Sequence, residues 1–245
     1  IKMNVEQLLQ TNYIDEFKQE KVIFRKYSDL GLLIVKRKYG SGYSDETPWL
    51  NNCRGLIINY KDHTIVFRPP VKAIEILTKD VFLEKVDSSY ELLDGTMINL
   101  FYFAGKWVTS TRSNIGCTNK WSQDMNFLQM FQECSLTLNY ETLHKEYTYS
   151  FVMRHTKNRH TSIVDTNELV LVDIYQGSTR MNDLPENDGY RVIRKSSTIN
   201  GLQKGLTGYK DGIRYKWLTT EHKFIDMIKP NTNNPCLNYL TLRNS

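Results

Sequence analysis

The chain of 245 residues has few of the residues that mark redox, metal-binding or membrane proteins. Its four cysteines form no CxxC pair, and its five histidines show no HExxH or zinc-type spacing. No apolar run approaches the roughly 18 to 20 residues that a membrane span needs, and the first ten residues do not resemble a secretory signal. We therefore expect no metal centre of these types, no disulfide framework and no membrane partner, and a reducing, cytoplasmic location.

Common nucleotide-binding signatures are missing as well. The sequence contains neither a P-loop, GxxxxGK[ST], nor the glycine-rich dinucleotide fingerprint, GxGxxG. It also lacks internal repeats and low-complexity linkers, so most of the chain is expected to form one unit. We expect one domain over residues 1–229 and an irregular tail or linker over 230–245 that leads toward a C-terminal domain missing from this chain.

The composition is that of an ordinary globular protein with a mildly basic character. Hydrophobic residues make up 40%, aromatic residues 12% and charged residues 24%, and the net charge is +5. This charge favours a phosphate-rich partner, although a slightly basic protein without such a partner fits it equally well. Frequent Asn, Lys, Ile and Tyr are typical of an AT-rich genome, such as that of a virus.

Periodicity along the chain predicts many strands and few helices. Strands are expected at 31–40, 54–60, 96–103, 106–112, 146–155, 168–175 and 189–195. Residues 3–19 are expected to begin with a short amphipathic helix through Val5, Leu8 and Leu9, and further helices are expected at 121–134, 139–146 and 219–229. Ser122 is the expected cap of the second helix, and Pro69-Pro70 should interrupt a strand at a sheet edge or a crossing. Without regular alternation of strands and helices, the pattern predicts an α+β fold with mixed, mostly antiparallel sheets flanked by helices.

Five separated stretches carry a resemblance when they are taken together and in order. They are "CRGLIINY", "RPPVKA", "ELLDGTMINLFYFAGKWVTSTRSNIG", "YTYSFVMRHTKNRH" and "QKGLTGYKDGIRYKWLT". Their order and spacing resemble the nucleotidyltransferase domain of phage-type ATP-dependent RNA ligases, from about residue 45 to 228. The resemblance implies a nucleotidyltransferase fold, which is ATP-grasp-like, and a role in resealing cut RNA such as tRNA anticodon loops.

The chemistry implied by the resemblance has three steps. A lysine amine attacks the α-phosphate of ATP, the AMP moves to an RNA 5′-phosphate, and a 3′-hydroxyl then displaces it. The first step needs an unprotonated amine, a Mg²⁺ ion and carboxylates that hold the metal and the ribose. Basic side chains stabilise the charge on the transferred phosphoryl group.

The resemblance carries over nine positions that would bind nucleotide or phosphate. They are Arg54, Lys72, Asp94, Gly95, Arg112, Phe151, Arg159, Arg214 and Lys216. Phe151 matches an aromatic position that can stack on a purine, and Arg214 and Lys216 match a final Lys-x-Lys whose cations meet the phosphates. Arg68 and Lys72 match a basic "RPxxKF" segment in which Ala73 replaces the usual aromatic residue.

Three positions depart from the chemistry of an active ligase. Leu92 stands at the position of the nucleophilic lysine, Ser150 at that of one glutamate and Lys204 at that of a second. Leucine cannot form a phosphoramidate bond with AMP, and the three replacements together raise the local formal charge by two units. We therefore hypothesise a pseudo-ligase that binds RNA, tRNA included, or a nucleotide such as ATP or AMP, without using Mg²⁺.

Two other interpretations stay open at this point. The protein can be an active, divergent ligase that uses Mg²⁺ and another nucleophile such as Lys204, or a ligase inactivated by an engineered replacement at Leu92. It can also be an interaction module whose partner is a protein in a larger assembly. His155 and His160 flank "TKNR", where a phosphate contact and an ordinary strand-end position are both open.

Overall fold

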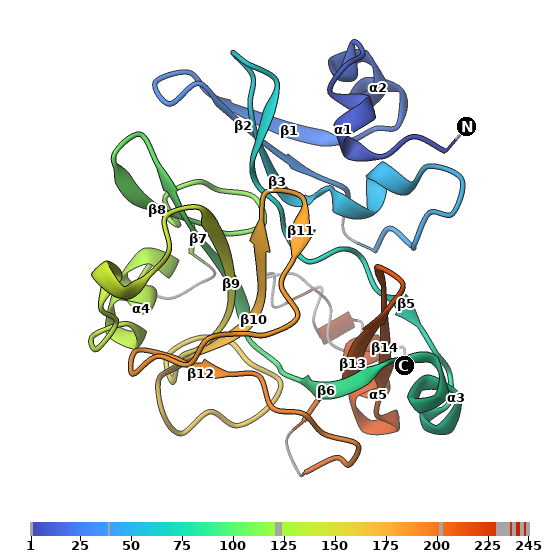
Figure 1. Ribbon diagram of the computed structural model, residues 1–245. Helices are drawn as coiled ribbons and strands as arrows, with labels where there is room; N and C mark the ends of the chain where they lie inside the picture. Colours follow the sequence, from blue (N-terminus) through green and yellow to red (C-terminus); the bar gives the residue numbers. More distant parts are fainter. Residues whose placement is uncertain are drawn as a thin grey trace.

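Three β-sheets form the framework of the protein, which was analysed as a computed structural model (Figure 1). The structure describes residues 2–38, 40–120, 124–200 and 203–228, and also 236, 239, 240 and 243. Strand pairs are antiparallel except for two short parallel pairs. These are β5 (Ile74–Glu75) with β14 (Ile213–Leu218) and β10 (Glu168–Gln176) with β12 (Arg191–Val192). The expected α+β class with mixed, mostly antiparallel sheets is confirmed.

The first sheet is an N-terminal layer with its own hydrophobic core. Its strands, in spatial order, are β1 (Ile23–Tyr27), β2 (Leu32–Lys36), β3 (Arg54–Asn59) and β4 (Thr64–Phe67). The helices α1 (Val5–Leu8) and α2 (Tyr13–Gln19) and the 3₁₀ turn η1 (Pro48–Asn52) pack on it. The short helix expected at the start of residues 3–19 is confirmed as α1. Thr11 caps its end through the carbonyl of Leu8, and a second helix, α2, follows from Asn12.

The second sheet is the centre of the molecule. Its strands, in spatial order, are β11 (Thr179–Arg180), β10 (Glu168–Gln176), β9 (Tyr147–Arg154), β7 (Thr96–Phe103) and β8 (Lys106–Ser110), with β12 (Arg191–Val192) beside β10. One face packs on α4 (Phe127–Cys134) and forms the largest core cluster. The other face meets the first sheet through contacts such as Phe67 with Phe101, whose ring centroids are 5.7 Å apart.

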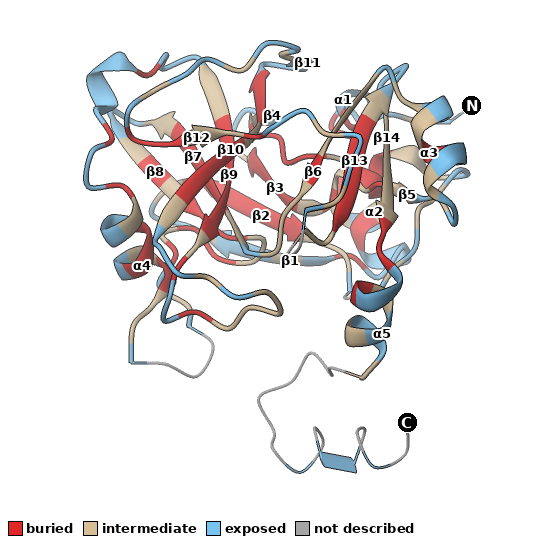
Figure 2. Ribbon diagram, turned by 90° about the horizontal axis from the view of Figure 1, so that it is seen from below, coloured by how far each residue is buried: buried red, intermediate tan, exposed pale blue. Residues whose placement is uncertain are grey.

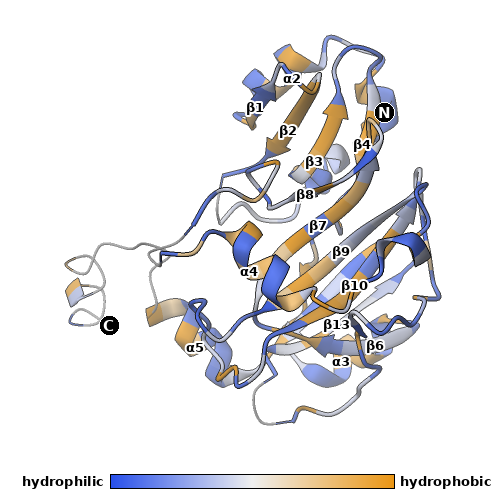
Figure 3. Cartoon of the chain, turned by 90° about the vertical axis from the view of Figure 1, so that its left-hand side faces the viewer, coloured by the Kyte–Doolittle hydropathy of each residue, from blue (hydrophilic) through white to orange (hydrophobic). Residues whose placement is uncertain are grey.

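The third sheet lies beside the second. Its strands, in spatial order, are β5 (Ile74–Glu75), β14 (Ile213–Leu218), β13 (Gly205–Lys210) and β6 (Ser88–Leu92). Helices α3 (Lys79–Lys85) and α5 (Thr220–Ile228) flank it (Figure 1). Buried residues concentrate in the strands of all three sheets, whereas α3 and α5 are largely exposed (Figure 2). Hydropathy follows the same division, with orange along β2, β3, β7 and β9 (Figure 3).

The chain passes from the third sheet to the second through residues 93–95, between β6 and β7. Glycine is required at position 95, because a Cβ there would lie 2.5 Å from Cγ1 of Val152 and 2.7 Å from the carbonyl oxygen of Met153. This close approach presses the turn onto β9. It brings the end of β6 and the start of β7 to the junction of the two sheets.

Several expected elements differ from those observed. The helix expected over 121–134 begins at Phe127, with Asn126 in place of Ser122 as its cap; Trp121 and Ser122 lie outside the described residues. The helix expected over 139–146 is a single 3₁₀ turn, η2 (Tyr140–Thr142). β4 ends before Pro69-Pro70, and the next strand, β5, belongs to another sheet, so the prolines mark a crossing. Most of the tail expected over 230–245 lies outside the described residues.

Among the described residues, no helix is both long and apolar enough to pass through a membrane.

Candidate nucleotide-binding site

A cavity of about 420 Å³ lies between the second and third sheets. Apolar side chains form much of its wall: Leu92, Met97, Val152, Val172, Leu184, Val192 and Ile193. Polar side chains lie among them: Arg54, Asp173, Arg180, Lys195, Thr207, Tyr209 and Arg214. Apolar walls with a few converging polar groups, at a volume of about 300 to 1,000 Å³, are typical of small-molecule sites. We call this the inter-sheet cavity.

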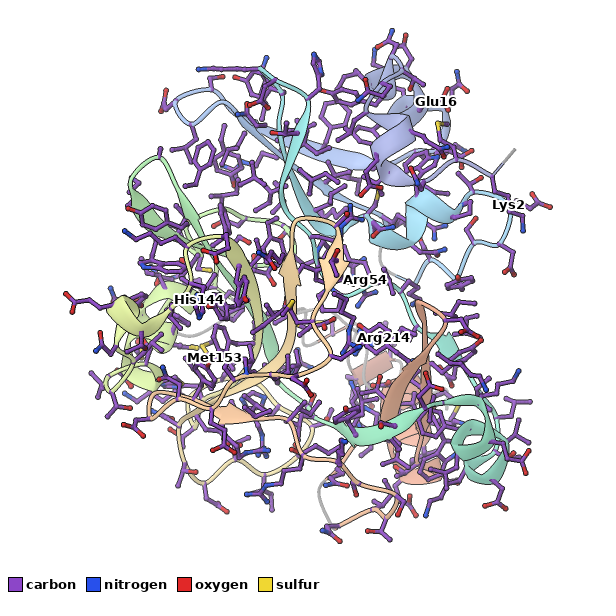
Figure 4. The ribbon with its side chains drawn as sticks, in the orientation of Figure 1. Lys2, Glu16, Arg54, His144, Met153 and Arg214 are labelled. Carbon is purple, nitrogen blue, oxygen red and sulfur yellow. The ribbon has the colours of Figure 1, made fainter. Side chains whose placement is uncertain are left out.

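Two of the arginines that we expect to bind phosphate line this cavity together. Arg54 begins β3 in the first sheet, and Arg214 lies in β14 of the third, so 160 residues of sequence separate them. Their side chains lie close together near the centre of the molecule (Figure 4). Burial, followed by the charges of Arg214 and Arg112, lowers the pKa of Arg54 to about 10. Arg54 therefore keeps its charge at neutral pH but holds it at an electrostatic cost.

Lys72 belongs to the same group of cations. Its pKa is lowered to about 8, first by burial and then by the charges of Arg54, Lys216, Arg112 and Arg37, in that order of importance. Five of the expected positions are thus electrostatically coupled in the structure: Arg54, Lys72, Arg112, Arg214 and Lys216. We call these five side chains the cationic cluster. Like charges held this close disfavour one another, and a bound anion would relieve the repulsion.

Carboxylates neutralise this cluster only in part. Lys216 pairs with Glu75 at 2.8 Å, and Nε of Arg214 donates a hydrogen bond to the hydroxyl of Thr207 at 3.2 Å. Among the described residues, the side chain of Arg54 has neither an ion pair nor a hydrogen bond. Arginine is suited to bind phosphate because its planar guanidinium offers paired N–H donors.

Leu92 lies in the apolar wall of the inter-sheet cavity, at the end of β6. It pairs with Gly205 of β13, and the backbone N–H of Lys204 donates to its carbonyl oxygen at 3.0 Å. The position expected for a nucleophilic lysine therefore shares a cavity with Arg54 and Arg214. A leucine there contributes hydrocarbon surface and no amine.

Ser150 is buried in the middle of a row of polar residues that crosses three strands. It pairs with Asn99 of β7 on one side and with Asp173 of β10 on the other. Position 150 itself carries no carboxylate, but the neighbouring strand places that of Asp173 directly opposite it.

Asp173 is the residue of this site that sequence reasoning missed. Its side chain is 1% exposed, accepts a hydrogen bond from the hydroxyl of Tyr209 at 2.6 Å, and lies 2.7 Å from Nε of Arg180. The guanidinium of Arg180 also lies over the Tyr209 ring at 3.7 Å. Burial raises the pKa of Asp173, while Arg180, Tyr209 and Arg214 act to lower it. The only sequence signal was an acid inside the apolar run "ELVLVDIY".

Asp94 holds a loop in place. Its carboxylate accepts hydrogen bonds from the backbone and hydroxyl of Thr161 and from the backbone N–H of Ser162, and Lys204 lies 4.0 Å away. Burial acts to raise the pKa of Asp94, but the Thr161 hydrogen bonds and Lys204 outweigh it, so the net shift is downward. Asp94, Arg112, Arg159 and Lys204 line a second cavity on the far side of the 93–95 turn.

Phe151 does not lie where a purine-stacking role requires. It is fully buried on the α4 face of β9, beside Tyr149 and Tyr190, and lines neither cavity. Met153, two residues on and therefore on the same face, points away from Arg54 and Arg214 (Figure 4). Val152, from the opposite face of β9, lines the inter-sheet cavity instead.

Two further basic or titratable positions have structural partners. Arg68 is buried and pairs with Glu6 and Asn52. His155 is fully buried, with Nε2 2.9 Å from a carboxylate oxygen of Glu133. Neither side chain is placed to contact an anion in the inter-sheet cavity.

Neither Asp173 nor Asp94 has its carboxylate free to hold a magnesium ion. Mg²⁺ requires oxygen ligands from carboxylates, carbonyls or water in near-octahedral geometry. The carboxylate of Asp173 is held by Arg180 and Tyr209, and that of Asp94 by Thr161 and Ser162. Within the described ranges, no group of three or more His, Cys, Asp or Glu could hold a metal.

Known proteins resemble this chain in sequence and in structure. No protein-family profile matches the chain. In sequence, 176 residues are 27% identical to a candidate bifunctional polynucleotide kinase/RNA ligase of Autographa californica nuclear polyhedrosis virus, which covers 63% of this chain and 25% of that protein. In structure, the chain matches a candidate ATP-dependent DNA ligase from Aquifex aeolicus at a TM-score of 0.56 and 15% identity, over 95% of this chain and 68% of the other. The fold is similar to that of the Aquifex protein.

The two likenesses show what this chain is similar to in sequence and in fold. The match spans only a quarter of the viral relative, and the structural neighbour is too distant in sequence to show more than the fold.

Proposed function

We propose that this protein binds an adenine nucleotide or an RNA phosphate end in the inter-sheet cavity, without forming a covalent adenylate at position 92. The observation that carries the proposal is the unneutralised charge of Arg54 beside Lys72 and Arg214. Arginines beside the apolar wall of one cavity match a ligand with a flat base and a phosphate group. The distant similarity to RNA and DNA ligases supports the same ligand class.

A pseudo-ligase fits the cavity better than an active ligase with a relocated nucleophile. Lys204 lies near Asp94 and lines the second cavity, on the far side of the 93–95 turn from Leu92. Among the described lysines, Lys195 is the one that lines the inter-sheet cavity. A covalent enzyme would therefore have to use Lys195, or move Lys204 around the turn.

The second cavity, which many cations line, favours phosphate binding over the interpretation as an interaction module. An interaction module needs an exposed apolar patch and no basic groove. A phosphate-binding protein instead needs cations at a surface that a nucleic-acid strand or a nucleotide can reach. Seven cationic side chains line the second cavity.

Equilibrium binding tests the proposal. We expect ATP and AMP to bind without Mg²⁺, and Arg54→Gln to weaken that binding by about 10- to 100-fold, because a charge-assisted hydrogen bond contributes about 1.5 to 3 kcal/mol. Arg25→Gln is the matched control, since Arg25 lies on edge strand β1 over the Tyr27 ring. Absence of binding by the unmodified protein, or equal effects of the two variants, would refute the proposal.

A further inference from the structure

A second cavity, of about 660 Å³, lies on the other side of the 93–95 turn. It shares Gly95 and Met97 with the inter-sheet cavity, so the two spaces meet at the turn. Seven Lys or Arg side chains and two Asp side chains line it, a formal surplus of five positive charges. We call it the basic groove. It is larger than the inter-sheet cavity and far more cationic.

The groove is built from rigid, closely packed backbone. Nη2 of Arg112 donates a hydrogen bond to the carbonyl oxygen of Arg37 at 3.1 Å, which ties the end of β8 to the end of β2. A Cβ at Gly55, where φ is +103°, would lie 3.0 Å from Cα of Arg112, so β3 packs directly on the same backbone. Lys36 and Lys38 flank Arg37, so this contact holds the backbone from which both side chains start.

The acids of the groove are already engaged. Asp94 accepts the hydrogen bonds from Thr161 and Ser162 and lies near Lys204. Asp226 lies 3.3 Å from His222 on α5. In contrast, Lys36 and Lys38 form no ion pair with any carboxylate in the part of the chain that the structure describes. The net field of the groove is therefore positive at neutral pH.

We propose that the basic groove binds the phosphodiester backbone of a single RNA strand, with the strand end directed toward the turn at Gly95. A row of cations matches the repeated charges of a phosphate chain better than it matches one mononucleotide. The shared lining at Gly95 and Met97 gives the terminal nucleotide a path toward Arg54. This inference rests on the proposed function of the inter-sheet cavity, and it adds a second binding surface and the N-terminal residues Lys36 and Lys38 to it.

The test compares two neutralised lysine pairs in the full chain. Lys36→Gln with Lys38→Gln removes two groove charges, and Lys61→Gln with Lys106→Gln removes two from exposed turns, Lys106 lying at the far end of β8 from the groove. Binding of a fluorescent single-stranded RNA is measured against salt concentration, and ATP binding is measured in parallel. A poly-glutamate peptide of equal charge serves as competitor.

The groove pair should weaken RNA binding by roughly an order of magnitude and reduce the salt slope by about 1.4, since each phosphate contact on a single strand contributes about 0.7. The control pair should change neither quantity as much, and both variants should bind ATP as the unmodified protein does. Equal RNA effects of the two pairs, or competition by poly-glutamate as strong as by unlabelled RNA, would overturn the inference. Failure of ATP binding in every variant would instead count against the inter-sheet site.

Discussion

The Asp173→Asn substitution removes a buried negative charge with almost no change of shape. Asp173 is 1% exposed, lies 2.7 Å from Nε of Arg180 and accepts the Tyr209 hydroxyl at 2.6 Å. Asparagine keeps the size and one acceptor oxygen, so the loss of stability reports the charge. Arg180 and the nearby Arg214 would then face the cavity without their carboxylate.

The expected cost follows from the burial of the pair. Breaking a buried ion pair from one side costs about 3 to 5 kcal/mol. The side chain of Arg180 is 22% exposed, so water compensates part of the loss and we expect about 2 to 3 kcal/mol. For a chain of this size, this corresponds to a fall in Tm of roughly 5 to 10 °C.

Urea unfolding at pH 7 measures this change. Asp183→Asn is the control, because Asp183 lines the same cavity but is exposed, and its effect should stay within about 0.5 kcal/mol. In a double-mutant cycle, the double variant Asp173→Asn with Arg180→Gln should lose less stability than the sum of the losses in the two single variants. A loss below about 1 kcal/mol for Asp173→Asn would show that the pair does not hold the cavity wall, and would refute the reasoning.

Three other outcomes follow from the structure. The pKa of Lys72 is about 8, so its charge is present below that pH and lost above it; affinity for ATP should fall as pH rises from 8, by up to about tenfold per unit, and Lys72→Gln should remove this fall. Gly95→Ala should destabilise by about 1 to 3 kcal/mol in urea unfolding because its Cβ meets Val152, whereas Gly42→Ala, with open space around it, should not. Leu92→Lys alone should yield no adenylate on incubation with α-labelled ATP and Mg²⁺, since the described residues contain no group of three or more His, Cys, Asp or Glu that could hold the metal; a labelled band would contradict this.

Local sequence pattern was sufficient for elements whose signals are local. The strand Thr96–Phe103, the turn at Ala104-Gly105 and the start of the returning strand at Lys106 were predicted correctly, because alternation and the turn residues agree. The segment 139–146 has few strong breakers and was expected to be a helix. It forms one 3₁₀ turn whose end, Leu143, is buried in the core, so tertiary packing overrides propensity there.

The site depends on contacts that the sequence does not encode locally. Collinear motifs indicated which cations to examine, and the structure brings Arg54, Lys72 and Arg214 together from distant segments of the chain. The motif could not settle which face of β9 carries Phe151, because a shift of one residue in a strand exchanges the two faces. Nor could it place Asp173 beside Ser150, since a bulge between Leu171 and Asp173 sets that register.

Intact-mass spectrometry of the unmodified protein, incubated with ATP and Mg²⁺ and compared with its equilibrium binding of ATP, tests the central claim most directly. The account predicts that ATP is retained reversibly and that the polypeptide mass does not change. A mass increase of one adenylate that maps to Lys195 or Lys204 would show a working nucleophile and contradict it.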